Sequence, residues 1–185
     1  MDQFMEEVVA PRKRGMQTLF LLVANVVWVL FAAYAFLQLQ NVTYCFTAEG
    51  FTMNTIIYLV QMVVFGGLAA LIFLRRDRIK TEYEYTFTNG QMDFAQVFNN
   101  KKRKSLGTMN IRNVEACGLV SSGSFQRYIN MQGIKRTNWF LNREAELLYF
   151  FFQKENQKRI IIIEPSEEMR NMIRHTLPQG VWQNN

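Results

Sequence analysis

Few side chains in this 185-residue sequence have the types and spacing that catalysis or metal binding requires. His175 is the only histidine, and it falls near the end of a predicted helix, where we expect it to have a structural role. Glu144 and Glu146 could pair as carboxylates, but they precede a predicted strand as solvated charges. The sequence has no metal-ligand spacing, phosphate-binding glycine loop or nucleophile motif. We therefore expect no enzyme activity, no cofactor and no metal site.

Positive charge is the chemical property that the sequence supplies in quantity. The formal net charge is +6, and residues 75–185 alone hold 18 Lys and Arg against 11 Asp and Glu. Much of this charge lies in two basic clusters. The first follows an apolar run and consists of Arg75, Arg76, Arg78 and Lys80; the second occupies a predicted turn and consists of Lys101, Lys102, Arg103 and Lys104. A cation near a membrane attracts anionic lipid by about 1 kcal/mol. Both clusters are therefore candidates for contact with a lipid surface.

The second cluster has an alternative role. Charged residues at a hairpin tip keep the edge of a sheet from pairing with another chain. Nucleic acid is not an expected partner of this cluster. The aromatic side chains around it alternate inward with the predicted strands, so they leave no exposed surface on which bases could stack.

Two long apolar runs precede the basic half of the chain. Met16–Leu39 and Asn54–Leu74 hold no charged residue. At about 1.5 Å per residue, each helix would cross the roughly 30 Å of a bilayer's hydrocarbon core. We predict two transmembrane helices joined by an extracytoplasmic loop, residues 40–53. A cleaved signal peptide is the alternative for the first run, because its residues 33–35 have the small-x-small pattern of a cleavage site.

Cations flank these two runs on one side only. Arg12, Lys13 and Arg14 precede the first run, the Arg75–Lys80 cluster follows the second, and residues 40–53 contain no Lys or Arg. The positive-inside rule then predicts a multi-pass protein of the cell membrane with both termini in the cytoplasm. In that topology Cys45 and Cys117 lie on opposite sides of the membrane. We expect free thiols, with an intermolecular Cys45 bridge as the alternative.

Small and polar residues within the two runs are candidates for helix packing. Gly66 and Ala70 form a small-xxx-small pair that lets two helices approach closely. Asn25 and Gln61 are amides at membrane depth, where each needs a hydrogen-bond partner. They would find it across the hairpin or in a second subunit, so a homo-oligomer is one outcome. A transport role is the other reading, but there is one amide per helix and no third span.

The remainder of the chain reads as a soluble domain, residues 75–185. Period-two alternation begins at Thr81, and the dipeptide Asn89-Gly90 predicts a tight hairpin. Further strands are expected over residues 91–98, 106–109, 113–120, 147–153 and 158–164, with a weak strand or irregular loop near 128–131. Ser166–Leu177 should close the domain as an amphipathic helix. The N-terminal segment, residues 1–15, is expected to be cytoplasmic and to begin with a short amphipathic turn or a frayed end.

This succession of strands and one C-terminal helix resembles a pleckstrin-homology-like (PH-like) fold. The stretches EYEYTFTNGQMDF, KRKSLGTMNIRNVEA and RIIIIEPSEEMRNMIRHTLP are similar to bacterial PH-like domains of the YcxB type. The resemblance implies a mainly-β, α+β domain: a barrel of about seven antiparallel strands capped by the helix. It brings no catalytic residue. Phosphoinositide-binding PH domains hold phosphates in a long loop between their first two strands, whereas here the expected connection is Asn89-Gly90.

Two functions follow as hypotheses. The protein is either a membrane-anchored interaction module, whose PH-like domain binds a protein or the anionic membrane surface, or an accessory subunit of a membrane complex recognised through its helices. We expect a protein partner in both cases, in addition to the bilayer itself. Crosslinking in native membranes would identify it.

Overall fold

The computed structural model describes residues 3–48 and 50–184. Glu49, the single charge of the predicted loop 40–53, lies outside the described residues. The chain forms two compact units, one of residues 13–80 and one that joins residues 1–12 to residues 81–185. The second unit therefore includes the N-terminal segment, which the sequence led us to treat as separate from the soluble domain.

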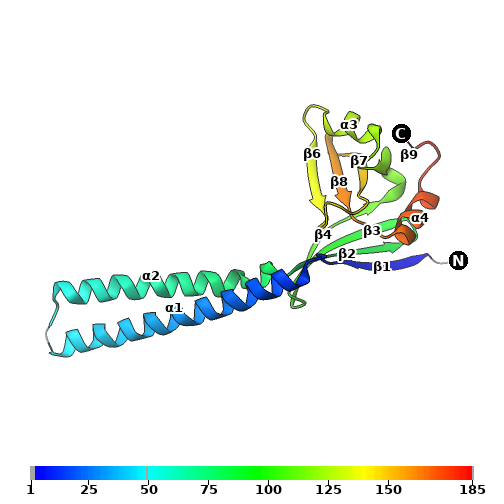
Figure 1. Cartoon of the computed structure of the whole chain (residues 1–185). Coiled ribbons are helices and arrows are strands. Elements are labelled where there is room, and N and C mark those ends of the chain that lie inside the picture. The colour runs from blue at the N-terminus through cyan, green and yellow to red at the C-terminus, as the bar shows by residue number, and fades with distance from the viewer. Residues whose placement is uncertain (1–2, 49, 185) are drawn as a thin grey trace. The chain divides into compact units, whose positions relative to one another are not determined.

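The first unit is a helical hairpin. Helix α1 covers Arg14–Ala48, α2 covers Met53–Arg75, and the 3-10 turn η1 covers Arg76–Ile79 (Figure 1). Helix α1 runs past Leu39 through most of the predicted loop, because Val42 and Cys45 are buried in the hairpin. The connection that remains is short, and the backbone N–H of Thr52 donates to Thr55 Oγ1 (3.2 Å) at the start of α2. Both helices are long and apolar enough to cross a membrane.

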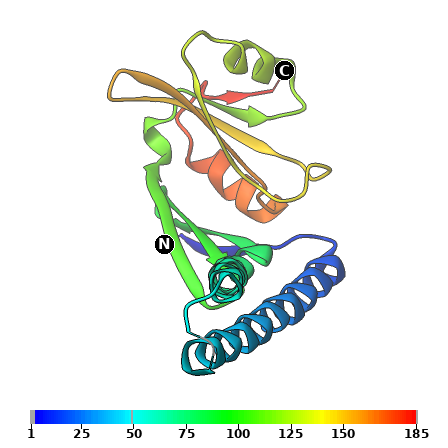
Figure 2. The ribbon, with the colours of Figure 1, turned by 90° about the vertical axis from the view of Figure 1, so that its left-hand side faces the viewer.

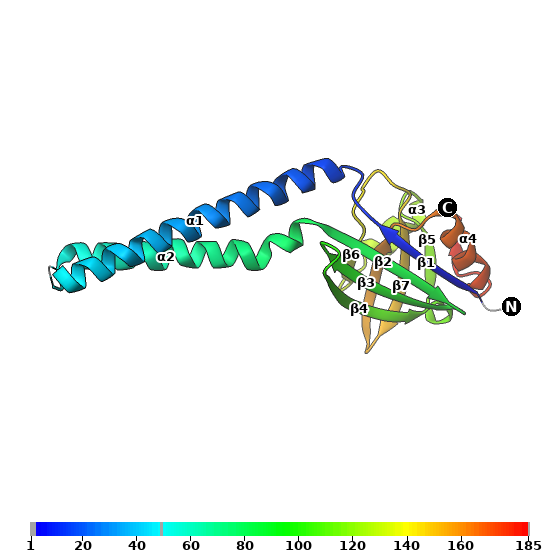
Figure 3. The same cartoon turned by 90° about the horizontal axis from the view of Figure 1, so that it is seen from below.

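The second unit begins with a four-stranded antiparallel sheet of order β1-β2-β3-β4 (Figure 3). Its strands are β1 (Phe4–Val9), β2 (Thr81–Thr88), β3 (Gln91–Phe98) and β4 (Lys102–Asn110). The expectation of a helical or frayed N-terminus is wrong, because β1 pairs along its whole length with β2. The first two strands are thus joined by the entire helical hairpin. Asn89-Gly90 instead joins β2 to β3, with the positive φ angles of 48° and 90° that a type I′ turn needs.

Strand β4 differs from its prediction at both ends. It begins at Lys102, so the basic cluster is mainly strand, and the turn before it contains Asn99 and Asn100, both with positive φ. The register shifts opposite Phe94 and Ala95, which pair with Gly107 and Ser105, respectively. Leu106 is therefore the extra residue of a β-bulge, and Gly107 adopts a φ of 150° that favours glycine.

A second sheet has the order β6-β8-β7-β5-β9. The strands are β5 (Ala116–Leu119), β6 (Lys135–Trp139), β7 (Leu148–Lys154), β8 (Gln157–Ile163) and β9 (Trp182–Gln183). The prediction of seven antiparallel strands is wrong in two respects: the described residues form nine strands, and β6 with β8 and β5 with β9 pair in parallel. Near 128–131, where a weak strand or an irregular loop was predicted, the chain forms the end of helix α3 (Gly123–Ile129) and a turn; α3 buries Phe125 against Tyr149.

One core joins the two sheets and the last helix, α4 (Glu167–Thr176). Met169 and Ile173 of α4 are fully buried among aromatic residues of both sheets. Figure 2 shows α4 beside the two sheets. The Ser166 side chain caps the start of α4, because its Oγ accepts from the N–H of Met169 (3.2 Å). Strands β7 and β8 contribute to a core cluster on each face, which accounts for their continuous apolar runs.

Candidate functional site

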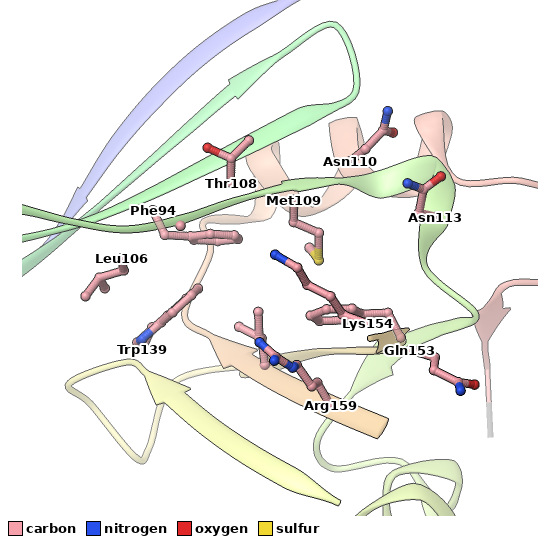
Figure 4. Close-up of a pocket in the computed structure, with 13 residues that line it drawn as sticks. Phe94, Leu106, Thr108, Met109, Asn110, Asn113, Trp139, Gln153, Lys154 and Arg159 are labelled. Atoms are coloured by element: carbon pink, nitrogen blue, oxygen red, sulfur yellow. The ribbon is translucent and has the colours of Figure 1, made fainter. Parts of the chain in front are cut away.

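A cleft of about 390 Å³ opens between the two sheets (Figure 4). One wall is β4, from Leu106 to Asn110, and η2 (Ile111–Asn113) carries the chain from there into the second sheet. The other wall is the end of β7, Phe152–Lys154, with Arg159 and Ile161 of β8. The volume falls within the roughly 300–1,000 Å³ of known ligand sites. The cleft is therefore the candidate binding site of the domain.

Aromatic side chains make the apolar part of the cleft. The rings of Phe94 and Trp139 lie 4.7 Å apart between centroids, at the end near Leu106 (Figure 4). The Tyr85 hydroxyl fixes the backbone behind this pair. It donates to the Trp139 carbonyl and accepts from the N–H of Glu164 (3.3 Å). The backbone of Trp139 is thus held in place from the core side.

The charged side chains that line the cleft are both basic. Lys154 and Arg159 reach it from the ends of adjacent strands, and no carboxylate is among the described lining residues (Figure 4). Arg159 faces Glu155 at 3.9 Å through Nη2, while its Nε is buried without a hydrogen-bond partner among the residues described. A guanidinium with unused donors can bind a carboxylate or phosphate in a bidentate manner. The site thus combines an apolar surface with an anion-binding end.

Burial changes the acid–base behaviour of groups in the core rather than in the cleft. Desolvation raises the pKa of the Cys117 thiol well above its ordinary value, which keeps it protonated and unreactive. Desolvation also raises the pKa of the Tyr85 phenol, and the nearby Glu164 carboxylate adds to this shift. A thiol and a phenol held neutral in this way support packing and hydrogen bonding, not nucleophilic chemistry.

The predicted basic cluster 101–104 lies at the start of the edge strand β4, with Lys101 in the turn before it. Its four side chains are exposed, and Arg103 forms an ion pair with Glu84 (2.6 Å) of β2. The cluster occupies the first half of β4, whereas the cleft follows the second half. The two features thus share one strand, a relation that the sequence analysis missed because it assigned residues 101–104 to a turn.

The second basic cluster belongs to the helical unit. Arg75 ends α2 and is exposed, whereas Arg76 is drawn into the hairpin. The Arg76 Nη1 donates to Asn25 Oδ1 (2.7 Å), and its guanidinium lies over the rings of Phe73 (4.3 Å) and Trp28 (5.4 Å). Arg78 is exposed and Lys80 half-buried. Only part of this cluster can therefore face a lipid surface.

The helix-packing candidates occupy separate places in the hairpin, and Ala70 is exposed. Asn25 binds Arg76, and Gln61 Oε1 accepts from the Tyr34 hydroxyl (3.4 Å). Gly66 faces Ala35 of α1, and Gly66 and Ala70 also line an apolar groove on the hairpin surface. The amides thus have partners within the chain, as one of the two sequence alternatives proposed.

A second hollow, of about 450 Å³, marks where β1 is fastened to the domain. Asn142 is central to it: its Oδ1 accepts from the Arg12 N–H (2.9 Å), and its amide donates to Ala10 O (3.1 Å) and Glu164 Oε1 (2.7 Å). The Glu7 carboxylate accepts from the Ser166 N–H (2.9 Å). These polar groups bind one another, so this hollow serves to hold the N-terminal strand.

Sequence reasoning missed the cleft because its residues are contributed by five strands. Trp139 lies where the sequence predicts no strand, and Lys154 and Arg159 lie at or next to the ends of two predicted strands. Their only sequence signal is a pair of cations beside strongly apolar strands. Within residues 3–48 and 50–184, no three His, Cys, Asp or Glu residues come together as metal ligands.

Comparison with known proteins gives one match. The family model described as "Bacterial PH-like domain (DUF6106)" matches residues 1–183. The match extends over the helical hairpin as well as the β-rich unit. This agrees with the strand pairing, because β1 precedes the hairpin in the chain, β2 follows it, and both belong to one sheet. No curated protein and no solved structure matches the chain.

Proposed function

Because this chain belongs to the family of bacterial PH-like domains, we propose that it is a membrane-anchored, non-enzymatic interaction module. PH-like domains are in general interaction modules rather than enzymes. The β-rich unit lies in the cytoplasm in this proposal and binds a protein or the anionic membrane surface. The observation that carries it is a cleft of ligand-site size in a domain whose strands β1 and β2 precede and follow an apolar helical hairpin in the chain.

The outer surface of the hairpin supports the membrane anchor. Large apolar side chains are exposed along both helices, including Leu19, Leu30, Phe36, Val63 and Leu74. A soluble protein rarely exposes an apolar surface of this extent, whereas lipid tails solvate it. The seven flanking cations, with none in residues 40–53, support the orientation with both termini in the cytoplasm.

Protease protection tests location and orientation together. Trypsin added outside intact cells should leave residues 81–185 uncut, and inside-out vesicles should expose the same sites. The protein should sediment with membranes and need detergent for extraction. Cleavage of the β-rich unit from outside intact cells, or recovery of the protein in the soluble fraction, would refute the proposed anchor.

The exposed cations of β4 support contact with anionic lipid. A dye at Ser105→Cys, in the full chain in nanodiscs, should be quenched by spin-labelled lipid more strongly when the disc contains phosphatidylserine than when it is zwitterionic. Changing residues 101–104 together to Ser should remove that difference. Equal quenching in both discs at low salt would exclude a lipid role for this strand.

The second candidate function is an accessory subunit recognised through its helices. The apolar groove supports it, because small residues there would allow another helix to approach closely; it is lined by Trp28, Ala32, Ala35, Gly66, Ala69, Ala70 and Phe73. Crosslinking in native membranes followed by mass spectrometry would identify the partner. Replacing both helices with unrelated transmembrane helices then separates the functions: retained binding supports the interaction module, and lost binding the accessory subunit.

A further inference from the structure

The cleft follows the free edge of β4. Successive side chains of a strand point to opposite faces of its sheet. Five successive residues, Leu106–Asn110, nevertheless line the same cavity. A cavity that touches all of them must run along the strand's edge, and β4 is the outermost strand of its sheet. Backbone N–H and C=O groups on such an edge are available to pair with an added strand.

The opposite wall contains a second free strand edge. Strand β7 pairs with β5 only as far as Phe151, which is opposite Ala116. Phe152–Lys154 therefore extend beyond β5 and keep a partner only on the β8 side. The chain passes from one sheet to the other through η2, next to this gap. The sheets are thus open where β4 and the end of β7 face the cleft.

The chemistry of the cleft favours an anionic ligand with an apolar part. Phe94, Trp139 and Ile161 supply apolar contacts, and Lys154 and Arg159 supply positive charge. The buried Nε of Arg159 has no partner in the described part of the chain. Beyond the cleft, the exposed side chains of Lys102 and Lys104 continue the positive charge along β4. No carboxylate is among the described residues that line the cleft, and the exposed Glu155 faces Arg159 from outside it at 3.9 Å.

We propose that an acidic peptide segment binds in an extended conformation along the edge of β4, with an apolar side chain against Phe94 and Trp139 and a carboxylate on Lys154 and Arg159. This inference rests on the proposed function and names the class of partner. Strand addition supplies affinity through backbone hydrogen bonds, and the cleft supplies specificity. A stretch of five residues, about 17 Å when extended, would follow Leu106–Asn110.

The test uses the full chain in zwitterionic nanodiscs and an mRNA-display library of random decapeptides. Selection should enrich peptides with Glu or Asp next to β-branched or aromatic residues. The double variant Lys154→Gln/Arg159→Gln should bind the enriched peptides at least tenfold more weakly. The control Lys135→Gln/Lys158→Gln removes the same charge on β6 and β8 outside the cleft, and should leave affinity within twofold. Absence of enrichment, enrichment of basic peptides, or equal loss in both double variants would overturn the proposal.

Two further measurements test the strand addition itself. An enriched peptide is made in two versions, one N-methylated at its odd and one at its even positions. Only one version should lose binding, because only its methyl groups replace the N–H groups that face β4. Hydrogen exchange should slow at least tenfold in residues 106–110 of the unmodified chain when the unmethylated peptide binds. Full binding of both methylated versions, or unchanged exchange in β4, would exclude pairing with this edge.

The outcome is separable from that of the proposed function. Protease protection and membrane extraction report on the anchor and do not involve the cleft. Vesicles containing phosphatidylserine provide the remaining comparison. These vesicles are used to displace an enriched peptide from the unmodified chain and from the Lys154→Gln/Arg159→Gln variant. Equal displacement from both would mean that the general positive charge of β4 binds the acidic peptide, and the cleft proposal would fail.

Discussion

The Tyr85 hydroxyl connects the core to the cleft, and its removal has a consequence that can be measured. Tyr85 is fully buried, and its hydroxyl lies between two backbone groups, the Trp139 carbonyl and the Glu164 N–H. Tyr85→Phe keeps the ring and deletes only the oxygen. Because the site is buried, water does not readily replace the lost partner. Both backbone groups then lose a hydrogen bond.

The size of the effect follows from those two groups. A buried polar group left without a partner costs about 1–3 kcal/mol. Trp139 and Glu164 are half-buried rather than fully buried, so about 1–1.5 kcal/mol, near the low end of that range, applies to each. We therefore expect Tyr85→Phe to lower the free energy of unfolding of the β-rich unit by about 2–3 kcal/mol. Each 1.4 kcal/mol changes the population of the opened domain about tenfold.

Hydrogen exchange of the full chain in zwitterionic nanodiscs measures this effect. Amides of β7 and β8, which exchange when the domain opens, should exchange roughly 30- to 150-fold faster in Tyr85→Phe. Tyr128→Phe is the matched control. It also keeps a packed ring, but its hydroxyl has no hydrogen-bond partner in the part of the chain that the structure describes. Equal exchange rates in the two variants would refute the role assigned to the Tyr85 hydroxyl.

Three further predictions concern alkaline pH, the hairpin and the N-terminal strand. Burial raises the pKa of Tyr85 above the unfolded value of about 10. The contribution of Tyr85 to the free energy of unfolding is therefore complete below pH 10 and is lost as the pH rises further, by up to about 1.4 kcal/mol per pH unit. Tyr85→Phe should make the free energy of unfolding fall less steeply with pH in this range. Asn25→Leu should destabilise the hairpin against SDS by about 1–2 kcal/mol, because Arg76 loses an acceptor, and more than Gln61→Leu, whose contact is longer; a larger effect of Gln61→Leu would contradict this. Glu164 Oε2 accepts from the N–H groups of Leu141 and Asn142 and so holds this loop. Glu164→Ala should therefore speed tryptic cleavage after Arg143 about tenfold, whereas the control Glu144→Ala should not. Equal cleavage of both variants would show that the Glu164 hydrogen bonds do not hold the loop.

Local sequence patterns accounted for much of the fold. Two uncharged runs predicted two long helices, because burial or lipid is the only favourable environment for so many consecutive apolar residues. Asn89-Gly90 predicted its hairpin because few residues other than Asn and Gly adopt positive φ readily. Ser166 predicted the start of α4 because its side chain can satisfy a free N–H at the first turn. In each case the physical cause lies within a few residues.

The features that local patterns misassigned depend on distant partners. The apolar residues of β1 fit helical spacing as well as a strand, and pairing with β2 across the whole hairpin decides between them. Residues 123–129 became a helix because Phe125 packs on Tyr149 of another strand. The parallel pairings of β6 with β8 and β5 with β9 were likewise invisible, since strand direction leaves no local trace.

The sequence by itself determined the separation into an apolar hairpin and a basic, β-rich domain, and the absence of recognisable catalytic motifs. It also supplied the cations of β4. Only the tertiary structure brought Phe94, Trp139, Lys154 and Arg159 around one cleft, because they come from four strands of two sheets. The physical reason is that a charge or an aromatic ring has the same local signature on any strand. Its role is decided by what the folded chain places opposite it.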